Sequence, residues 1–397
     1  EMMGAASVRD ARQAAAKIMS PSVNLVLADR TTIALQSTGR APLRGPNHAS
    51  RGQMPAAGWV ARNDWQGFVP FDQMPFALNP VGGIVVNTNN RLTDEAYPKH
   101  FTYDWGDSQR IERARLLLGG RQFHTLDSFV EIQTDIVSPA ARALLPLIGR
   151  DLWYTDGPAP SDSPTRLRRQ ALEALAAWNG EMTEHGAEPL IYAAWIRALQ
   201  RRLILDELGG LAARFTTPDA LFLERVFRDT DGAATWCDIQ TSARVESCSE
   251  MASQALDAAL IELSELYGTR LEAWRWGEAH AALHRHMVLG ELPLIHWLFN
   301  IRQPTGGGDH TLMRAQMRNA GPTPYINTHA AGYRMVVDFS DPDASRFVLA
   351  TGQSGHFLSR HYDDLSVLWR RGEYLSMSLD PVLARAGADG ITELTPL

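Results

Sequence analysis

Three asparagines that follow a short apolar run are the residues of this sequence best suited to chemistry. They lie in Asn87-Thr88-Asn89-Asn90, directly after Ile84-Val85-Val86, which predicts a short buried strand. Asparagine is depleted in strands and is costly to bury without hydrogen-bond partners. A side-chain amide fixed at a strand end is a neutral donor that can stabilise a developing oxyanion. The alternative is an Asn-rich turn without a catalytic role, and the local sequence leaves both open.

Two glycine-containing segments partly match a serine-hydrolase elbow and a phosphate-binding loop. Gly352-Gln353-Ser354-Gly355-His356 has the serine of a hydrolase elbow, but His356 replaces the final glycine and no helix start follows. Gly306-Gly307-Gly308-Asp309 lacks the Lys-Ser/Thr pair of a phosphate-binding loop. We therefore expect a loop at the first segment and a flexible turn at the second.

A histidine cluster is the possible metal site of the C-terminal half. Its members are His280, His284, His286 and His296. His280 and His284 have the spacing of one helical turn, yet the segment is not His-Glu-x-x-His and no carboxylate stands at a matching position. Histidines satisfied in the core or at the surface are the favoured interpretation.

The two cysteines, Cys237 and Cys248, lie close together in the sequence. Two cysteines alone cannot hold a structural zinc, and no histidine pair at finger spacing stands beside them. They could close a disulfide loop before a helix, which would imply an oxidising compartment. Two unpaired core thiols are the alternative, and the spacing alone does not decide between them.

Bulk properties exclude some classes of protein. At 397 residues the chain can form one large domain or two ordinary ones. Its formal net charge of −7 disfavours a general nucleic-acid-binding surface. No apolar run approaches the length needed to span a membrane.

Strands at both ends of the chain enclose a helical middle. Helices dominate from Ser108 to about Gly268, and the long segment from Gly39 to Trp59 predicts a surface loop. This order predicts one α+β domain over residues 1–397. The other predicted elements are helices at 8–19 and 363–371, and strands at 24–28, 32–36, 311–317, 334–339 and 346–350.

A series of short motifs, from near residue 20 to about residue 374, resembles the penicillin acylase family. The agreement rests on the order and spacing of the motifs together. The most informative are Trp65-Gln66-Gly67-Phe68, Asn79-Pro80-x-x-Gly83, Asn87-Thr88-Asn89, Tyr97-Pro98, Trp105-Gly106 and Arg110-Ile111, with Ala141-Arg142, Trp178-Asn179-Gly180, Trp276-Gly277-x-x-His280 and Gly352-Gln353-Ser354-Gly355-His356 further along.

The resemblance implies the αββα sandwich of N-terminal-nucleophile hydrolases, with a helical insertion from about residue 120 to 270. In such enzymes a serine at the start of the large subunit attacks an amide, and its own α-amino group acts as base. By motif, Asn89 is the side-chain donor to the oxyanion, and Arg110 supports the site. The alternative for Arg110 is a helix-surface arginine paired with Glu112 or its neighbours.

Nothing in this chain matches the segment that carries the nucleophile in the resembled family. We therefore expect the serine outside this chain, and no activity from the chain alone. The resemblance implies a periplasmic or secreted heterodimer, with a small subunit and that N-terminal segment as partners. In that setting we expect Cys237 and Cys248 to form a disulfide.

The resemblance also implies the substrates and cofactors. The expected substrates are small-molecule amides, either N-acyl homoserine lactones or β-lactams that carry an acyl side chain. No cofactor is expected for catalysis. A structural calcium is a further expectation, with Asp94, Asp104 and Asp107 as possible ligands. The alternative function is a non-catalytic remnant or binding subunit of the same fold.

Overall fold

The computed structural model describes residues 1–93, 99–153, 164–388 and 390–396. By residue contacts the chain divides into two compact units, of which the first comprises Glu1–Phe123 with Asp338–Pro342. The second comprises His124–Val337 with Asp343–Leu397. The organisation of residues 1–397 as one domain stays a prediction. Within the described ranges, every helix is too short or too polar to cross a lipid bilayer.

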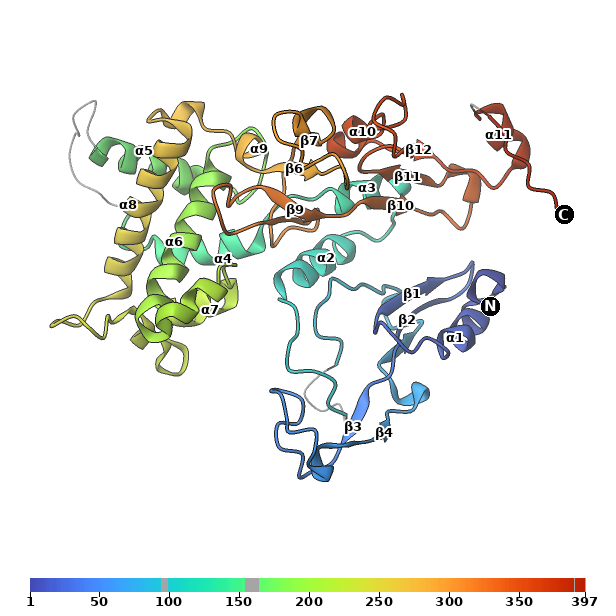
Figure 1. Ribbon diagram of the computed structural model, residues 1–397, viewed down its shortest axis with the longest axis horizontal. Coiled ribbons are helices and arrows are strands. Elements are labelled where there is room, and N and C mark those ends of the chain that lie inside the picture. The colour runs from blue at the N-terminus through green and yellow to red at the C-terminus, as the bar shows by residue number, and fades with distance from the viewer. Residues whose placement is uncertain (94–98, 154–163, 389, 397) are drawn as a thin grey trace. The chain divides into compact units, whose positions relative to one another are not determined.

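The first unit is built on two small antiparallel sheets (Figure 1). Asp29 fixes the turn between the first two strands, because its carboxylate accepts the backbone N–H groups of Thr31 and Thr32 at 2.9 Å. A bond from the N–H of Val8, together with those from Thr31 and Thr32, lowers the pKa of Asp29 to about 2. One sheet contains β1 (Asn24–Ala28), β2 (Ile33–Ser37) and β5 (Phe76–Leu78), and the other contains β3 (Pro42–Arg44) and β4 (Trp65–Phe68). The helices of this unit are α1 (Val8–Ala15) and α2 (Gln109–Gly119).

The structure corrects the predictions for a loop and for a helix in this unit. The segment from Gly39 to Trp59 is not a continuous loop, because β3 lies inside it and pairs with β4. The first helix ends at Ala15 rather than at residue 19. The backbone N–H groups of Lys17 and Ile18 already bond three residues back, which is the tighter pattern of a fraying helix end.

A helical bundle forms the core of the second unit, as the predicted insertion at about 120–270 requires. Its longest helices, α6 and α8, pack along each other, and Trp195 of α6 is completely buried and donates its indole N–H to the carbonyl of Ala252 in α8 at 2.8 Å. The bundle comprises α4 (Pro139–Ile148), α5 (Pro164–Ala177), α6 (Glu188–Leu208), α7 (Ala220–Phe227) and α8 (Cys248–Tyr267), whereas α3 (Leu126–Gln133) packs against β10 (Tyr333–Val336).

Two further sheets follow the bundle in the sequence and complete the second unit. In the four-stranded sheet, of order β7-β6-β9-β8, only the β6–β9 pair is parallel. The mixture of helices and sheets confirms the α+β class. The strands are β6 (Ala281–His284), β7 (Ile301–Pro304), β8 (Ala315–Met317), β9 (Asn327–Ala330), β10 (Tyr333–Val336), β11 (Arg346–Leu349) and β12 (Leu375–Ser376), with helices α9 (Trp276–Ala279), α10 (Ser366–Arg371) and α11 (Pro381–Ala386).

The strand predicted at 311–317 is shorter than expected. Only Ala315–Met317 pairs as a strand, because Thr311 holds the preceding residues in a tight turn. Its hydroxyl accepts the N–H of Gly308 at 2.9 Å and donates to the carbonyl of Met313 at 2.8 Å. A local side-chain bond of this kind competes with strand pairing.

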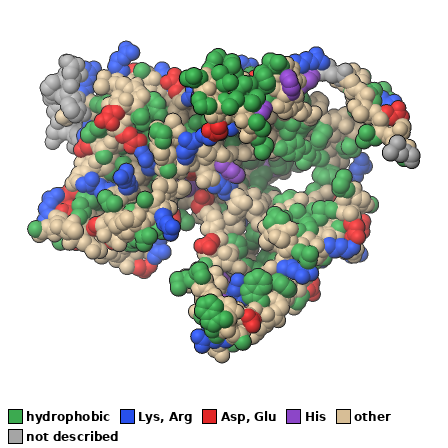
Figure 2. Space-filling view, viewed as in Figure 1, with side chains coloured by type: hydrophobic (Ala, Val, Ile, Leu, Met, Phe, Trp, Pro, Cys, Tyr) green, Lys and Arg blue, Asp and Glu red, His purple; other side chains and the backbone are tan. Residues whose placement is uncertain are grey.

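Exposed apolar side chains gather on the segment between β6 and β7. Met287 is 98% exposed, Leu294 89% and Trp297 67%. Figure 2 shows a broad hydrophobic area over this part of the molecule. An apolar surface of this kind is typical of an interaction site.

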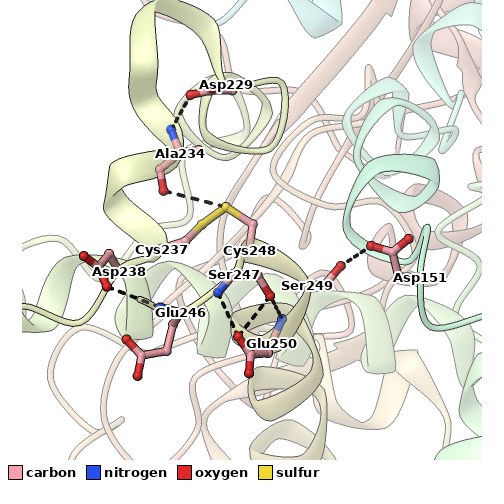
Figure 3. Close-up of a disulfide and its surroundings, with 10 residues drawn as sticks. All are labelled: Asp151, Asp229, Ala234, Cys237, Asp238, Glu246, Ser247, Cys248, Ser249 and Glu250. Atoms are coloured by element: carbon pink, nitrogen blue, oxygen red, sulfur yellow. Dashed lines mark hydrogen bonds between the residues drawn. A yellow bond between two sulfur atoms is a disulfide. The ribbon is translucent and has the colours of Figure 1, made fainter. Parts of the chain in front are cut away.

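Cys237 and Cys248 meet at the start of α8 (Figure 3). Their sulfur atoms lie 1.94 Å apart, at disulfide distance, and Cys237 is buried. The loop that they enclose is closed a second time by Glu246, whose carboxylate accepts the N–H of Ile239 at 3.1 Å. Ser247 and Glu250 cap α8 reciprocally, so the cross-link lies at a well-defined helix start.

Replacing both cysteines by alanine should lower the free energy of unfolding by about 3 kcal/mol. The bond joins residues 11 apart, and closing a loop of that length restricts the unfolded chain by about this amount. Urea unfolding with and without dithiothreitol measures the effect. Reductant should destabilise the wild type and leave the double variant unchanged. Equal stability of the two oxidised proteins would contradict a bond that contributes to folding.

His280 is a fully buried histidine between α9 and β6. Its ring stacks on Trp276, with centroids 4.2 Å apart, and its Nδ1 lies 2.6 Å from the carbonyl oxygen of Tyr325. Burial penalises the charged ring and lowers the pKa of His280 to about 4. The side chain is therefore neutral at pH 7 and acts as a core hydrogen-bonding group.

Stability should fall as the pH is lowered from 6.5 to about 4. In this window the unfolded chain binds a proton at His280 and the folded chain does not, so the free energy of unfolding decreases by up to ~3 kcal/mol. Urea unfolding midpoints at several pH values measure this slope. His280→Gln should flatten it, and the exposed His185→Gln is the matched control. Part of the slope should remain, because burial also lowers the pKa of His284.

Candidate functional site

The segment from Asn79 to Asn90 carries the predicted oxyanion donor and is anchored at its start to β2. The backbone N–H of Asn79 donates to the carbonyl of Ile33, and the Asn79 side chain accepts the N–H of Ile33, both at 2.9 Å. Asn79 has a φ of +42°, a left-handed conformation that asparagine tolerates. A turn closed by the bond from Gly83 N–H to the Pro80 carbonyl follows. The sheet of the first unit therefore positions this segment.

The strand predicted at Ile84-Val85-Val86 is not formed. These residues have no ladder partner among those that the structure describes, and Ile84 is 37% exposed. Three apolar residues form a strand only where a neighbouring strand supplies hydrogen bonds, and the apolar run by itself does not provide one. The asparagines therefore follow extended backbone rather than the end of a paired strand.

Asn89 lies at the turn of a compact, self-bonded loop. Its backbone N–H donates to the side-chain oxygen of Asn87 at 3.3 Å, and the Thr88 N–H donates to that of Asn90 at 3.1 Å. A φ of +67° turns the Asn89 side chain away from these bonds, and it is exposed. The asparagines therefore form a turn, and the role of the Asn89 amide as an oxyanion donor stays a prediction.

Arg110 holds the Asn89 side chain in a single orientation. Its Nη2 lies 3.2 Å from Oδ1 of Asn89, and the residue is only 7% exposed at the start of α2. Arg110 is therefore not at the helix surface, and its supporting role in a site stays a prediction. A guanidinium has only donors, so the atom that faces it must be the amide oxygen. The amide nitrogen of Asn89 consequently points away, and in the described part of the chain no acceptor occupies it.

Gly106 completes the loop by allowing two backbone segments to approach closely. Asn90 and Gly106 form an isolated parallel bridge. A β-carbon built on Gly106 would lie 2.5 Å from the carbonyl oxygen of Asn89, which is closer than van der Waals contact permits. The sequence analysis named Gly106 only as part of a motif. The contact partner lies 17 residues away, so only the three-dimensional structure shows why glycine is needed.

The remaining candidates behave differently from Asn89 and Arg110. His284 lies on strand β6 and not on a helix with His280, and no group of three or more metal-ligating side chains occurs among the described residues. Ser354 lies in a loop, where its hydroxyl accepts the N–H of His356 at 3.1 Å. Asp94 and the Tyr97-Pro98 motif lie outside the described residues. The calcium site stays a prediction.

Comparison with known proteins identifies the family. A sequence model of the penicillin amidase family matches residues 1–385. The chain belongs to this family. Thermostable penicillin G acylase from Alcaligenes faecalis has a similar structure, with a TM-score of 0.66 and 18% sequence identity over 99% of this chain and 71% of that one. This likeness confirms the predicted N-terminal-nucleophile hydrolase fold.

Two types of named acylase are among the relatives of this penicillin amidase family member. Acyl-homoserine lactone acylase QuiP of Pseudomonas syringae pv. syringae (strain B728a) is 27% identical over 395 residues, which cover 95% of this chain and 46% of the relative. Penicillin acylase 2 proenzyme of Pseudomonas sp. (strain SE83) is 29% identical over 323 residues, or 80% of this chain and 39% of the relative. The chain thus spans about half the length, or less, of the curated relatives that it matches.

Gly106→Ala should lower the free energy of unfolding by about 1–3 kcal/mol, since the added methyl group must displace the Asn89 backbone. Gly119→Ala is the matched control, because a β-carbon there meets no atom within 4 Å. Urea unfolding of the two variants measures the difference. Equal free energies of unfolding in both variants would show that the Asn89 loop can shift to accept the methyl group without loss of stability.

Proposed function

We propose that this chain supplies the oxyanion-stabilising side of an amide-hydrolysing site. In this proposal a serine carried outside this chain attacks the carbonyl carbon of a secondary amide, with its α-amino group as base. The C–N bond then breaks, the amine leaves with the serine proton, and water hydrolyses the acyl-enzyme. The products are a carboxylic acid and an amine.

The orientation of Asn89 is the observation that carries the proposal. Arg110 accepts no hydrogen bond, so it fixes the amide oxygen and leaves both amide N–H bonds directed elsewhere. A donor held in advance loses little freedom when charge develops on the substrate oxygen, which is the basis of oxyanion stabilisation. Arg110 is a positioning residue here, because it acts through Asn89.

The relatives support two substrate classes. Their names include an acyl-homoserine lactone acylase and a penicillin acylase. We infer that the substrate is a small molecule with an acyl amide, either an N-acyl homoserine lactone or a β-lactam with an acyl side chain. The reaction as proposed needs no cofactor, since the serine, its amine and the amide donor account for each proton and electron pair.

The assembly that we propose is a processed heterodimer in the periplasm or outside the cell. Its partners are a small subunit and the segment that bears the nucleophile. The paired cysteines support an oxidising compartment, because disulfides persist in such compartments and are rare in the cytosol. Exposed apolar residues between β6 and β7 support further protein contact.

Asn89→Ala in the complete protein should lower kcat by about a hundredfold or more, because one oxyanion donor contributes on the order of 3 kcal/mol to the transition state. Release of primary amine from an acyl homoserine lactone and from a penicillin measures turnover. Asn47→Ala, at an exposed asparagine of the same unit, is the matched control. Unfolding midpoints should be alike in both variants.

Two outcomes would reject the proposal. Wild-type turnover in Asn89→Ala would remove Asn89 from the site. Absence of turnover in the complete wild-type protein, with both substrate classes, would favour the alternative of a non-catalytic remnant or binding subunit. The chain alone should show no turnover, and activity of the chain alone would reject a nucleophile from outside.

A further inference from the structure

Arg334, on strand β10, is a buried cation without a carboxylate partner. It is 6% exposed, and its Nη1 donates to the backbone carbonyl of Trp369 at 2.7 Å. Its guanidinium carbon lies 4.8 Å from the centre of the Trp369 ring. No acidic side chain pairs with Arg334 in the part of the chain that the structure describes. Burial lowers the pKa of Arg334, and the charge is nonetheless retained at neutral pH because guanidinium is a very weak acid.

Two more arginines border the same small cavity. Arg370 is neutralised by Glu184, with N–O distances of 2.6 and 3.1 Å. Arg314 donates through Nη2 to the neutral Gln316 at 3.1 Å, and its buried Nε has no partner within the described structure. The walls comprise Thr305, Gly306, Met313, Arg314, Ala315, Asn327, Ala330, Arg334, Trp369 and Arg370.

The charges around this cavity do not balance. Three guanidinium groups meet one paired carboxylate, that of Glu184. Asp309 interacts with Arg314, but burial penalises its charged form and raises the pKa of Asp309. An uncompensated buried charge is strongly destabilising. A negative charge at the cavity would remove this cost.

The size of the cavity limits what can carry that charge. Its volume of about 10 Å³ admits about one water-sized ligand. Asn327, which is buried, adds an amide to the arginine donors and is fixed by a bond from its Nδ2 to the Thr305 hydroxyl at 3.2 Å. The polar side chains that border this space come from Arg314 just before β8, Asn327 on β9, Arg334 on β10 and Arg370 on α10. Guanidinium groups bind anions through charge-assisted hydrogen bonds.

We propose that the cavity between Arg314, Arg334 and Arg370 binds a monatomic anion of the chloride class. The anion balances the charges of Arg334 on β10 and of Arg314 just before β8, since Arg370 is already paired with Glu184. It is a structural ligand of the second unit, and the proposal is independent of amide hydrolysis at Asn89.

Crystals of the wild-type protein soaked in sodium bromide test the location. Bromide scatters anomalously and replaces chloride, so an anomalous peak is expected within hydrogen-bond distance of the Arg314 and Arg334 guanidinium groups. Water alone at this position, with bromide only at the surface, would overturn the proposal. This measurement requires no variant and does not depend on the folding of one.

Thermal unfolding at constant ionic strength tests the energetics. Replacing gluconate by chloride should raise the Tm of the wild type by about 1–3 °C for each tenfold increase above Kd. Arg334→Gln should remove this dependence, and Arg385→Gln, at an exposed arginine, should keep it. Arg314→Gln is the second variant, since Arg314 is less buried and the change is less disruptive. Chloride dependence that is equal in all three variants and the wild type, or absent from the wild type, would overturn the proposal.

Discussion

A guanidinium group can donate hydrogen bonds but cannot accept them, and the geometry around Asn89 depends on this asymmetry. Arg110 is buried at the start of α2 and faces the side chain of Asn89 across 3.2 Å. The amide can satisfy the arginine with its oxygen alone, so its nitrogen must point the other way. The amide N–H groups of Asn89 are thereby oriented, and oxyanion stabilisation requires oriented donors. The turn at Asn87–Asn90 and the close approach of Gly106 restrict the backbone of Asn89.

In the second unit, the donor-only character of a guanidinium group determines the contacts of Arg334. Arg334 is also buried, but the group that it meets is a backbone carbonyl, which accepts a hydrogen bond and brings no formal charge. Among the described residues Arg370 is paired with a carboxylate and Arg334 is not, so the two arginines differ in electrostatics although they border one cavity. The proposed anion follows from this difference, because burial without a counter-charge is the costly case.

Buried side chains are distributed unevenly between the helical bundle and the Asn89 loop. The helical bundle is held by completely buried residues such as Trp195 and Leu256, and the cysteine pair fixes the start of α8. The Asn89 loop has few such contacts, and much of its order comes from local hydrogen bonds. Functional loops on a rigid scaffold commonly have this character. Exposed apolar residues, such as Val26 on β1 and Trp297 beyond β6, mark surfaces suited to the additional protein that we propose.

The sequence by itself determined which residue types were available and where regular structure would form. Apolar periodicity predicted that helices dominate from Ser108 to about Gly268, where α6 and α8 lie, because long helices are stabilised by a continuous buried face. Motif order identified Asn89 and Arg110, although nothing in the spacing required them to touch. Tertiary structure decided the rest. It left Ile84-Val85-Val86 unpaired, since a strand needs a neighbour that its own sequence cannot specify. It brought Arg110 to Asn89, Gly106 to the Asn89 carbonyl and three arginines to one cavity, because these contacts join residues that are distant in the chain and are set only when the elements pack.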